Sequence, residues 1–231
     1  MTTQEAQKLF DLLQKHYPHA HIVLDFSNHF ELLVAIILSA QCTDKKVNEV
    51  TALLFPKFKK ERSELKQTYA TYEKTVKLPH DELVQIVNFA FTPLHELEQD
   101  IKQTGFYHNK ANNVQKAAKV VLDTFHGILP KTITEMTTIP GVGRKTANVF
   151  LSNAYHIDEG IAVDTHVMKQ SQLLGLSKNK TPEKIEQDLM ALFPQSQWHQ
   201  LTYMLIEHGR NKRMAKAKQI RCNDPSCILC A

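Results

Sequence analysis

Residues 134–150 read TEMTTIPGVGRKTANVF, and this stretch decides the fold: a short helical segment, then Pro-Gly-Val-Gly, then a second helix that begins at Arg144. Proline sets the turn, while Gly141 and Gly143 can adopt positive φ and allow another backbone to come close. With no side chain at either glycine, the N–H groups of the turn and of the next helix point outward as anion donors. The pattern predicts a helix-hairpin-helix that binds DNA phosphate without reading sequence, with an ordinary interhelical turn as the alternative.

Two ionisable residues follow the turn at positions where a helix begins. Lys145 falls in the first turn of the second helix, where the positive end of the helix dipole favours the neutral, nucleophilic amine. Asp164, in Ala-Val-Asp-Thr-His-Val, stands where a cap would begin the next helix. Such an amine can attack C1′ of deoxyribose while the carboxylate stabilises the developing oxocarbenium charge or orients the amine. Taken singly, Lys145 could be a solvated phosphate contact and Asp164 a simple cap.

Composition describes an ordinary globular protein. The chain has 231 residues, of which 42% are hydrophobic and 23% charged, and its longest apolar run spans only residues 32–38. A bilayer-spanning helix needs about 20 apolar residues, so a membrane span is excluded. Residues 1–5 contain no basic segment of a secretory signal, and we therefore expect a cytoplasmic protein. Three of the four cysteines lie close to the end of the chain, which favours metal ligands, or the remnant of such a site, over a disulfide framework.

Charge is concentrated near the C-terminus. The net charge is only +4, but residues 210–221 contain six cations and no acid. A run of this kind suits a polyanion such as DNA, and a solvated basic tail explains it equally well.

Apolar spacing predicts a chain that is nearly all helix. Apolar residues recur at spacings of three and four residues, and glycine and proline are few. This pattern indicates about ten helices in two lobes. Thr2 and Glu5 form a capping box for a first helix, and Asp44 is expected to cap the helix after the apolar run. Further helices are expected over 94–101, over 111–125, after Thr181-Pro182 and around 198–206, with a surface excursion over 57–77. Residues 21–26 give the only hint of a strand, and no second run is present to pair with it, so we expect no sheet.

Five motifs in order resemble the endonuclease III family of DNA glycosylases with AP-lyase activity, within the helix-hairpin-helix glycosylase superfamily. They are LSAQCTD at 38–44, GFYHNKA at 105–111, the hairpin at 139–148, VDTHV at 163–167 and HGR at 208–210. The resemblance covers most of the chain. It implies an all-α fold, with a six-helix barrel domain over residues 28–158 that holds the hairpin, and a second helical domain formed by residues 1–27 and 159–231.

The resemblance also implies a function. A protein of this family excises oxidised pyrimidines and cleaves the strand at the abasic site by β-elimination through a lysine Schiff base. Its partner would be double-stranded DNA with a damaged base or an abasic site, bound by a monomer in the cytoplasm at the nucleoid. The alternatives are a mismatch adenine glycosylase, which lacks the lysine, and a non-catalytic helix-hairpin-helix DNA-binding protein.

By motif position, Lys145 resembles the Schiff-base lysine of the family and Asp164 its catalytic aspartate. Gln41 resembles the residue that fills the gap left by the flipped base, and Phe106 falls where the family places an apolar wedge. The alternatives are a helix-end glutamine and a core phenylalanine. The residues expected to bind DNA are Gln41, Phe106, Gly141, Val142, Gly143, Arg144 and Thr146.

The C-terminal cysteines depart from the family pattern. The family commonly ends in four cysteines, spaced six, two and five apart, that hold a [4Fe-4S] cluster. This chain has Cys222, Cys227 and Cys230, spaced four and two apart, and the first cysteine position of the family falls on Arg213. A cluster normally takes four thiolates, so we expect no cofactor and a cluster-free tail. Cys42 is expected in the core, and zinc binding through His208 is a weaker alternative.

A second departure is the stretch over residues 57–91, which is longer than the usual connection in the family. We expect it to add a surface helix.

Overall fold

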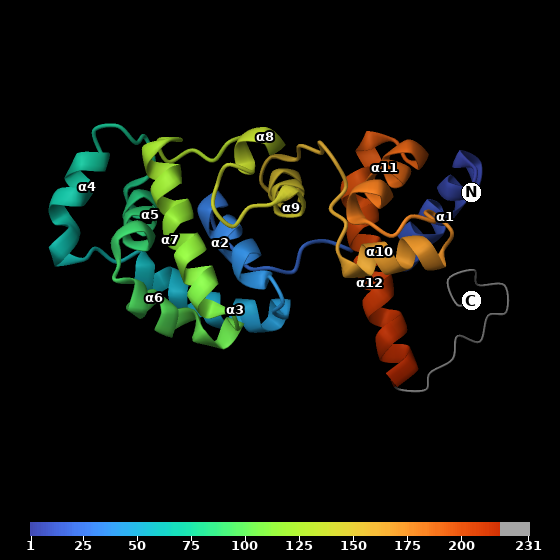
Figure 1. Ribbon diagram of the computed structural model, residues 1–231. Helices are drawn as coiled ribbons and strands as arrows, with labels where there is room; N and C mark the ends of the chain where they lie inside the picture. The colour runs from blue at the N-terminus through green and yellow to red at the C-terminus, as the bar shows by residue number, and fades with distance from the viewer. Residues whose placement is uncertain (218–231) are drawn as a thin grey trace. The chain divides into compact units, whose positions relative to one another are not determined.

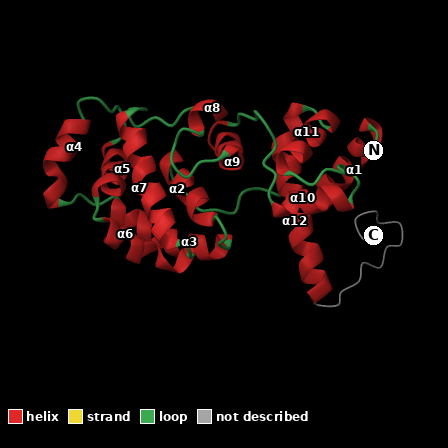
Figure 2. Ribbon diagram, viewed as in Figure 1, coloured by secondary structure: helices red, strands yellow, loops and turns green. Residues whose placement is uncertain are grey.

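The computed structural model describes residues 1–217, with side chains described through residue 211. Within that range twelve α-helices and three short 3-10 helices are present and no strand is seen, so the all-α expectation is confirmed (Figure 2). Residues 21–26, the only hint of a strand, have no regular secondary structure, which confirms the expectation that no sheet forms in this part of the chain. The helices form two compact units, Val23–Ile157 and a second that joins Met1–Ile22 to the chain from Asp158 onward.

The 23–157 unit is built around α2 (His29–Ser39). Every residue of α2 from Phe30 to Leu38 is buried, because α3 (Asp44–Phe58), α7 (Tyr107–Asp123) and α9 (Arg144–Tyr155) pack around it. Figure 1 shows α5 (His80–Phe91) alongside α7, with α6 (Leu94–Ile101) packed against both α3 and α7. The apolar run of residues 32–38 is therefore the centre of this unit.

The start of α3 corrects one prediction. Thr43, not Asp44, is the N-cap: its hydroxyl accepts a hydrogen bond from the Lys46 amide at 3.3 Å, and Asp44 is the first helical residue. Both positions favour an oxygen, since a side-chain acceptor satisfies a free N–H and a carboxylate in the first turn complements the helix dipole.

The 57–91 stretch is only partly the expected surface addition. A 3-10 turn (Ser63–Leu65) and α4 (Lys66–Tyr72) form the short surface helix, anchored by the buried Tyr69. The second half is different, because residues 83–90 of α5 are all buried and contribute to the core of the unit. Tyr69 connects the two parts: its hydroxyl donates to Asn88 of α5 at 2.6 Å.

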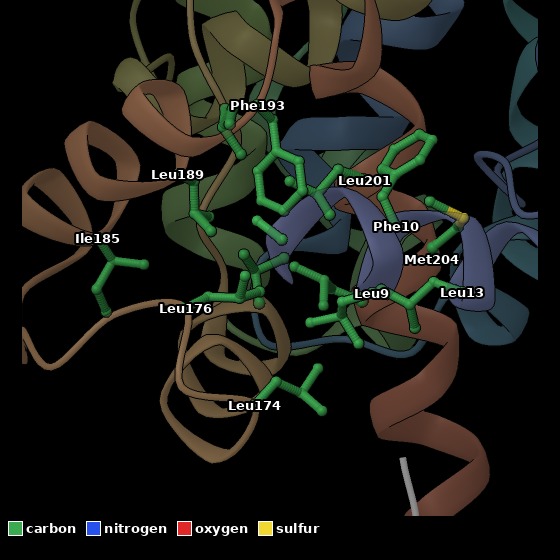
Figure 3. Packing of buried hydrophobic residues seen from close by; sticks show 14 of the residues in the cluster. Leu9, Phe10, Leu13, Leu174, Leu176, Ile185, Leu189, Phe193, Leu201 and Met204 are labelled. Carbon is green, nitrogen blue, oxygen red and sulfur yellow. The ribbon is translucent and has the colours of Figure 1, made fainter. Parts of the chain in front are cut away.

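The other unit consists of α1 (Thr3–His16), α10 (Thr165–Leu173), α11 (Pro182–Leu192) and α12 (Trp198–Ala217). The capping box of Thr2 and Glu5 is present. The apolar faces meet in one core, part of which Figure 3 shows with Leu9, Phe10 and Leu13 of α1 facing Leu189, Leu201 and Met204. A Cβ on Gly209 of α12 would lie 3.0 Å from Nδ1 of His166 on α10, so glycine lets these two helices approach closely.

Within residues 1–217, no helix combines the length and the apolar character needed to cross a bilayer.

Candidate functional site

The helix-hairpin-helix forms as the sequence predicts. Short α8 (Ile133–Met136) leads into the turn, and α9 begins at Arg144 with Gly143 as its N-cap. The Val142 amide donates to the Ile139 carbonyl at 3.0 Å, and both side chains are buried. These two apolar residues hold the turn on the unit from inside, so neither the buried side chain of Val142 nor its bonded amide is available to a DNA phosphate.

The two glycines of the turn serve different purposes. Gly141 has φ +82°, and a Cβ there would lie 3.0 Å from Cβ of Asn113 on α7, so both conformation and space require glycine. Gly143 has φ −92°, which any residue adopts, and a Cβ there would meet nothing within 4 Å. No side chain of the N-cap covers the start of α9, which leaves that helix N-terminus approachable by an anion.

Lys145 is exposed in the first turn of α9, and none of the described carboxylates forms an ion pair with its amine. Exposed Arg144 and half-buried Thr146 flank it. The hairpin therefore presents two cations and the donors of a helix N-terminus on one short segment.

Asp164 is the N-cap of α10, as predicted. Its Oδ1 accepts a hydrogen bond from the Val167 amide at 2.8 Å, and the residue is half-buried. One carboxylate oxygen is thereby oriented by the helix that follows. Asp164 belongs to the unit built on both chain ends, whereas the hairpin belongs to the 23–157 unit.

Gln41 and Phe106 share an unusual backbone. Gln41 lies between α2 and α3 with φ +52°, and Phe106, the N-cap of α7, has φ +47°, values that disfavour residues other than glycine. Both side chains are exposed, and that of Phe106 remains 65% accessible, so the alternative of a core phenylalanine is wrong. A residue held in this region costs roughly 1–3 kcal/mol and persists only where the surrounding structure fixes it.

Sequence reasoning missed Lys110, which lies beside these two residues. It is 4% exposed, and its Nζ donates to the carbonyls of Leu38 at 2.8 Å and Thr104 at 2.7 Å. Burial lowers the pKa of the Lys110 amine, and the nearby Cys42 thiol acts in the opposite direction. The available signal was its position directly before Ala111 on the apolar face of α7, where a charged residue is unexpected.

The metal prediction falls largely on residues that the structure does not describe. Cys222, Cys227, Cys230 and the side chain of Arg213 lie outside the described part, as does most of the basic run that begins at exposed Arg210. Among the described residues, no three His, Cys, Asp or Glu side chains gather into a group that could bind a metal ion. Cys42 is half-buried in the loop after α2 rather than in the core.

His208, the weaker zinc alternative, is buried in α12. Its Nδ1 lies 2.9 Å from the Tyr17 hydroxyl, which engages that nitrogen in a hydrogen bond.

Comparison with known proteins agrees with this geometry. The family model of the HhH-GPD superfamily base excision DNA repair proteins matches residues 34–195, which include the hairpin, Lys145 and Asp164. The endonuclease III of Synechocystis sp. is 40% identical over 207 residues, covering 90% of this chain and 83% of the relative. The chain belongs to the endonuclease III family.

Solved endonuclease III structures share the fold. The structure of a non-covalent endonuclease III–DNA complex matches with a TM-score of 0.76 and 38% identity, covering 99% of this chain and 94% of the other. A trapped endonuclease III–DNA covalent intermediate matches with a TM-score of 0.75 and 36% identity, covering 98% and 92%. Solved members of the family thus include one bound to DNA non-covalently and one trapped on DNA as a covalent intermediate.

Proposed function

We propose that this protein is a bifunctional DNA glycosylase that removes oxidised pyrimidines from double-stranded DNA and then cleaves the strand at the abasic site. The observation that carries the proposal is Lys145, an exposed amine in the first turn of α9, directly after a hairpin whose backbone donors suit phosphate. The likeness to an endonuclease III trapped covalently on DNA supports it.

In the proposed complex the hairpin binds the backbone of the damaged strand. Gly141 and Gly143 offer backbone donors, while the Val142 amide is bonded to the Ile139 carbonyl and holds the turn in shape. Arg144 and Thr146 add side-chain contacts to phosphate. Exposed Gln41 fills the space vacated by the flipped base, and exposed Phe106 wedges between bases of the duplex. Contacts of this kind position the enzyme without reading sequence, which suits a search for damage at any site.

The proposed chemistry uses one amine for two bond cleavages. Nζ of Lys145 attacks C1′ as the glycosidic bond breaks, and the base leaves with the bonding electron pair and takes up a proton. The nitrogen loses a proton and the sugar ring opens, which leaves a Schiff base between Nζ and C1′. Removal of a 2′ proton then expels the 3′ phosphate, which is β-elimination. Asp164 stabilises positive charge on the sugar as the base departs.

Borohydride trapping tests this proposal. Protein mixed with duplex that contains thymine glycol or an abasic site should form a covalent adduct when borohydride reduces the Schiff base. Lys145→Gln should abolish the adduct, base release and strand cleavage while still binding abasic DNA, and Lys116→Gln, which removes an exposed lysine of α7, should leave all three intact. An adduct that persists in Lys145→Gln would assign the chemistry to another amine.

The second catalytic residue has its own variant. Asp164→Asn should slow base excision severely and keep the fold, because asparagine is an acceptable cap but carries no negative charge. Wild-type protein that binds abasic DNA without forming any adduct would favour the non-catalytic binding protein. Excision of adenine from mismatches without an adduct would favour the mismatch adenine glycosylase.

We also propose that the barrel domain of the family corresponds to residues 28–158 and the second domain to residues 1–27 and 159–231. The enzyme would act as a monomer on DNA in the cytoplasm. The tail would hold no [4Fe-4S] cluster, since its three cysteines and Arg213 supply fewer thiolates than the four that a cluster takes.

A further inference from the structure

The buried amine of Lys110 joins the ends of two helical segments. Leu38 lies in the last turn of α2, and Thr104 is the last residue of the 3-10 helix Lys102–Thr104. Carbonyls at such ends have no partner within the helix, and a cation there is favoured by the helix dipole. Because Nζ donates to both carbonyls, at 2.8 and 2.7 Å, a single side chain satisfies an acceptor at each end.

Each of these ends leads directly into a strained, exposed residue. Gln41 follows Leu38 by three positions, and Phe106 follows Thr104 by two, with Gly105 between them at φ +69°. Both non-glycine residues adopt positive φ, so each must be held there by its surroundings. Lys110 is the described side chain that bonds to the backbone preceding both of them.

Space filling alone does not account for an amine at this position. Methionine would occupy a similar volume without burying a charged group, and burial of an ammonium is costly unless its hydrogen bonds compensate. The amine fixes the distance between two carbonyls from different segments, which an apolar side chain does not do.

We propose that Lys110 is a positioning residue that fixes the Gln41 and Phe106 segments relative to each other, so that both side chains enter the duplex as one rigid probe. The proposal rests on the function proposed above, in which Gln41 and Phe106 contact the duplex around the flipped base. Lys110 itself touches neither substrate nor reacting atoms, since its amine is buried against the backbone.

Hydrogen exchange of the free protein tests the structural half of the proposal without any substrate. In Lys110→Met, amides of residues 39–43 and 105–107 should exchange roughly tenfold or more faster than in wild type, both segments together, because the bonds that hold them are lost. Amides of α9 should be unchanged. Lys116→Met, an exposed lysine on the same helix, is the matched control and should leave both segments as in wild type.

A mutant cycle tests the functional half. Single-turnover excision of base-paired thymine glycol is measured for wild type, Gln41→Ala, Phe106→Ala and the double variant, and again with Lys110→Met added to each. If the two side chains act as one rigid probe, the effects of Gln41→Ala and Phe106→Ala on the excision rate are non-additive. This coupling between the two substitutions should vanish in the Lys110→Met background. Lys110→Met alone should reduce excision roughly tenfold to a hundredfold, the effect of losing hydrogen bonds from a charged donor, yet reduce cleavage of a preformed abasic site far less.

The possible outcomes separate the two proposals. Failure of wild type to form a borohydride adduct would refute the proposed function, whereas exchange would still report whether Lys110 joins the segments. If wild type forms the adduct but the coupling survives in Lys110→Met, or only one segment loses protection, the positioning role is overturned. If Lys110→Met does not fold, Lys110→Gln is measured in the same way. If amides across the whole 23–157 unit lose protection evenly in such a variant, Lys110 has a general role in the core, and the positioning role is again overturned.

Discussion

The two glycines of the hairpin offer a paired experiment, because the structure assigns different costs to replacing each of them. Gly141→Ala places a methyl group at a backbone with φ +82° and within 3.0 Å of Asn113 Cβ, whereas Gly143→Ala places one in open space at an ordinary φ of −92°. We therefore expect Gly141→Ala to destabilise the protein, and Gly143→Ala to impair DNA binding with little change in stability.

The magnitudes follow from the local geometry. A non-glycine residue in the left-handed region costs roughly 1–2 kcal/mol, and the reduced entropy of the unfolded chain returns about 0.4–1 kcal/mol. The close approach to Asn113 adds to the cost at Gly141. We therefore expect Gly141→Ala to lower the free energy of unfolding by about 1 kcal/mol or more, which lowers Tm by roughly 2–4 °C at this chain length. At Gly143, alanine is a poorer N-cap than glycine by about 0.5–1 kcal/mol, which the same entropy gain offsets.

The assay combines unfolding with DNA binding. Unfolding is followed by far-UV circular dichroism, because the single tryptophan, Trp198, lies in the other unit and does not report on the hairpin. Affinity for abasic duplex is measured by fluorescence anisotropy at several salt concentrations. A methyl group at residue 143 that keeps a phosphate from the N-terminus of α9 should weaken binding roughly tenfold to a hundredfold, the range for a hydrogen bond to a charged group.

The salt series supplies a second readout, since three or four neutralised phosphates make wild-type affinity fall roughly tenfold for each doubling of salt. Unchanged affinity of Gly143→Ala would refute the assignment of the hairpin backbone as the phosphate site. Equal stability of the two variants would refute the strain argument at Gly141.

Three further predictions concern the base-flipping residues, the tail and a buried carboxylate. Gln41→Ala and Phe106→Ala should impair excision from base-paired lesions more than cleavage at an abasic site, where no base has to be extruded; equal losses in both rates would indicate damage to the fold. Purified protein should be colourless and free of iron by elemental analysis, and about four irons per chain would contradict the argument from three cysteines. Burial alone would raise the pKa of Glu31, but hydrogen bonds from Gln85 and Ser27 and the ion pair with Lys59 outweigh it and hold the pKa below its usual value. The stability that this carboxylate contributes is therefore complete above the pKa it has in the unfolded chain and is lost as the pH falls, so Glu31→Gln should flatten the dependence of Tm on pH below about 4.5.

Local signals in the sequence predicted the site best where a single segment determines the structure. The hairpin and the beginning of α9 at Arg144 follow from Pro-Gly-Val-Gly, and the cap of α10 follows from Asp164 before a run of helix formers. Each of these features depends on residues only a few positions apart, so the backbone rules for glycine, proline and caps suffice.

The features that the sequence did not reveal depend on contacts between distant segments. Residues 83–90 of α5 are all buried, including the polar Gln85 and Asn88, whose amides donate to the carbonyls of Phe55 and Phe58 on α3. For Phe106, residue type alone favours the core, and only its position in the GFYHNKA motif predicted the exposed side chain that the structure has. Lys110 reads as an ordinary helical lysine until its two carbonyl partners are known.

In the proposed complex with DNA, the described residues of the 23–157 unit divide recognition between two kinds of group. At the hairpin the backbone supplies the donors, and Gly143 keeps side chains out of the way, so affinity there needs little beyond the start of α9. At Gln41 and Phe106 the side chains supply the contact, and the backbone must hold each in a conformation that it would otherwise avoid. A phosphate site formed by a rigid helix end is complete in the free protein, whereas two strained segments keep their shape only if something else fixes them. On the proposed positioning role, this difference accounts for a buried amine bonded to the backbone ahead of Gln41 and Phe106, whereas apolar Val142 and Ile139 anchor the hairpin.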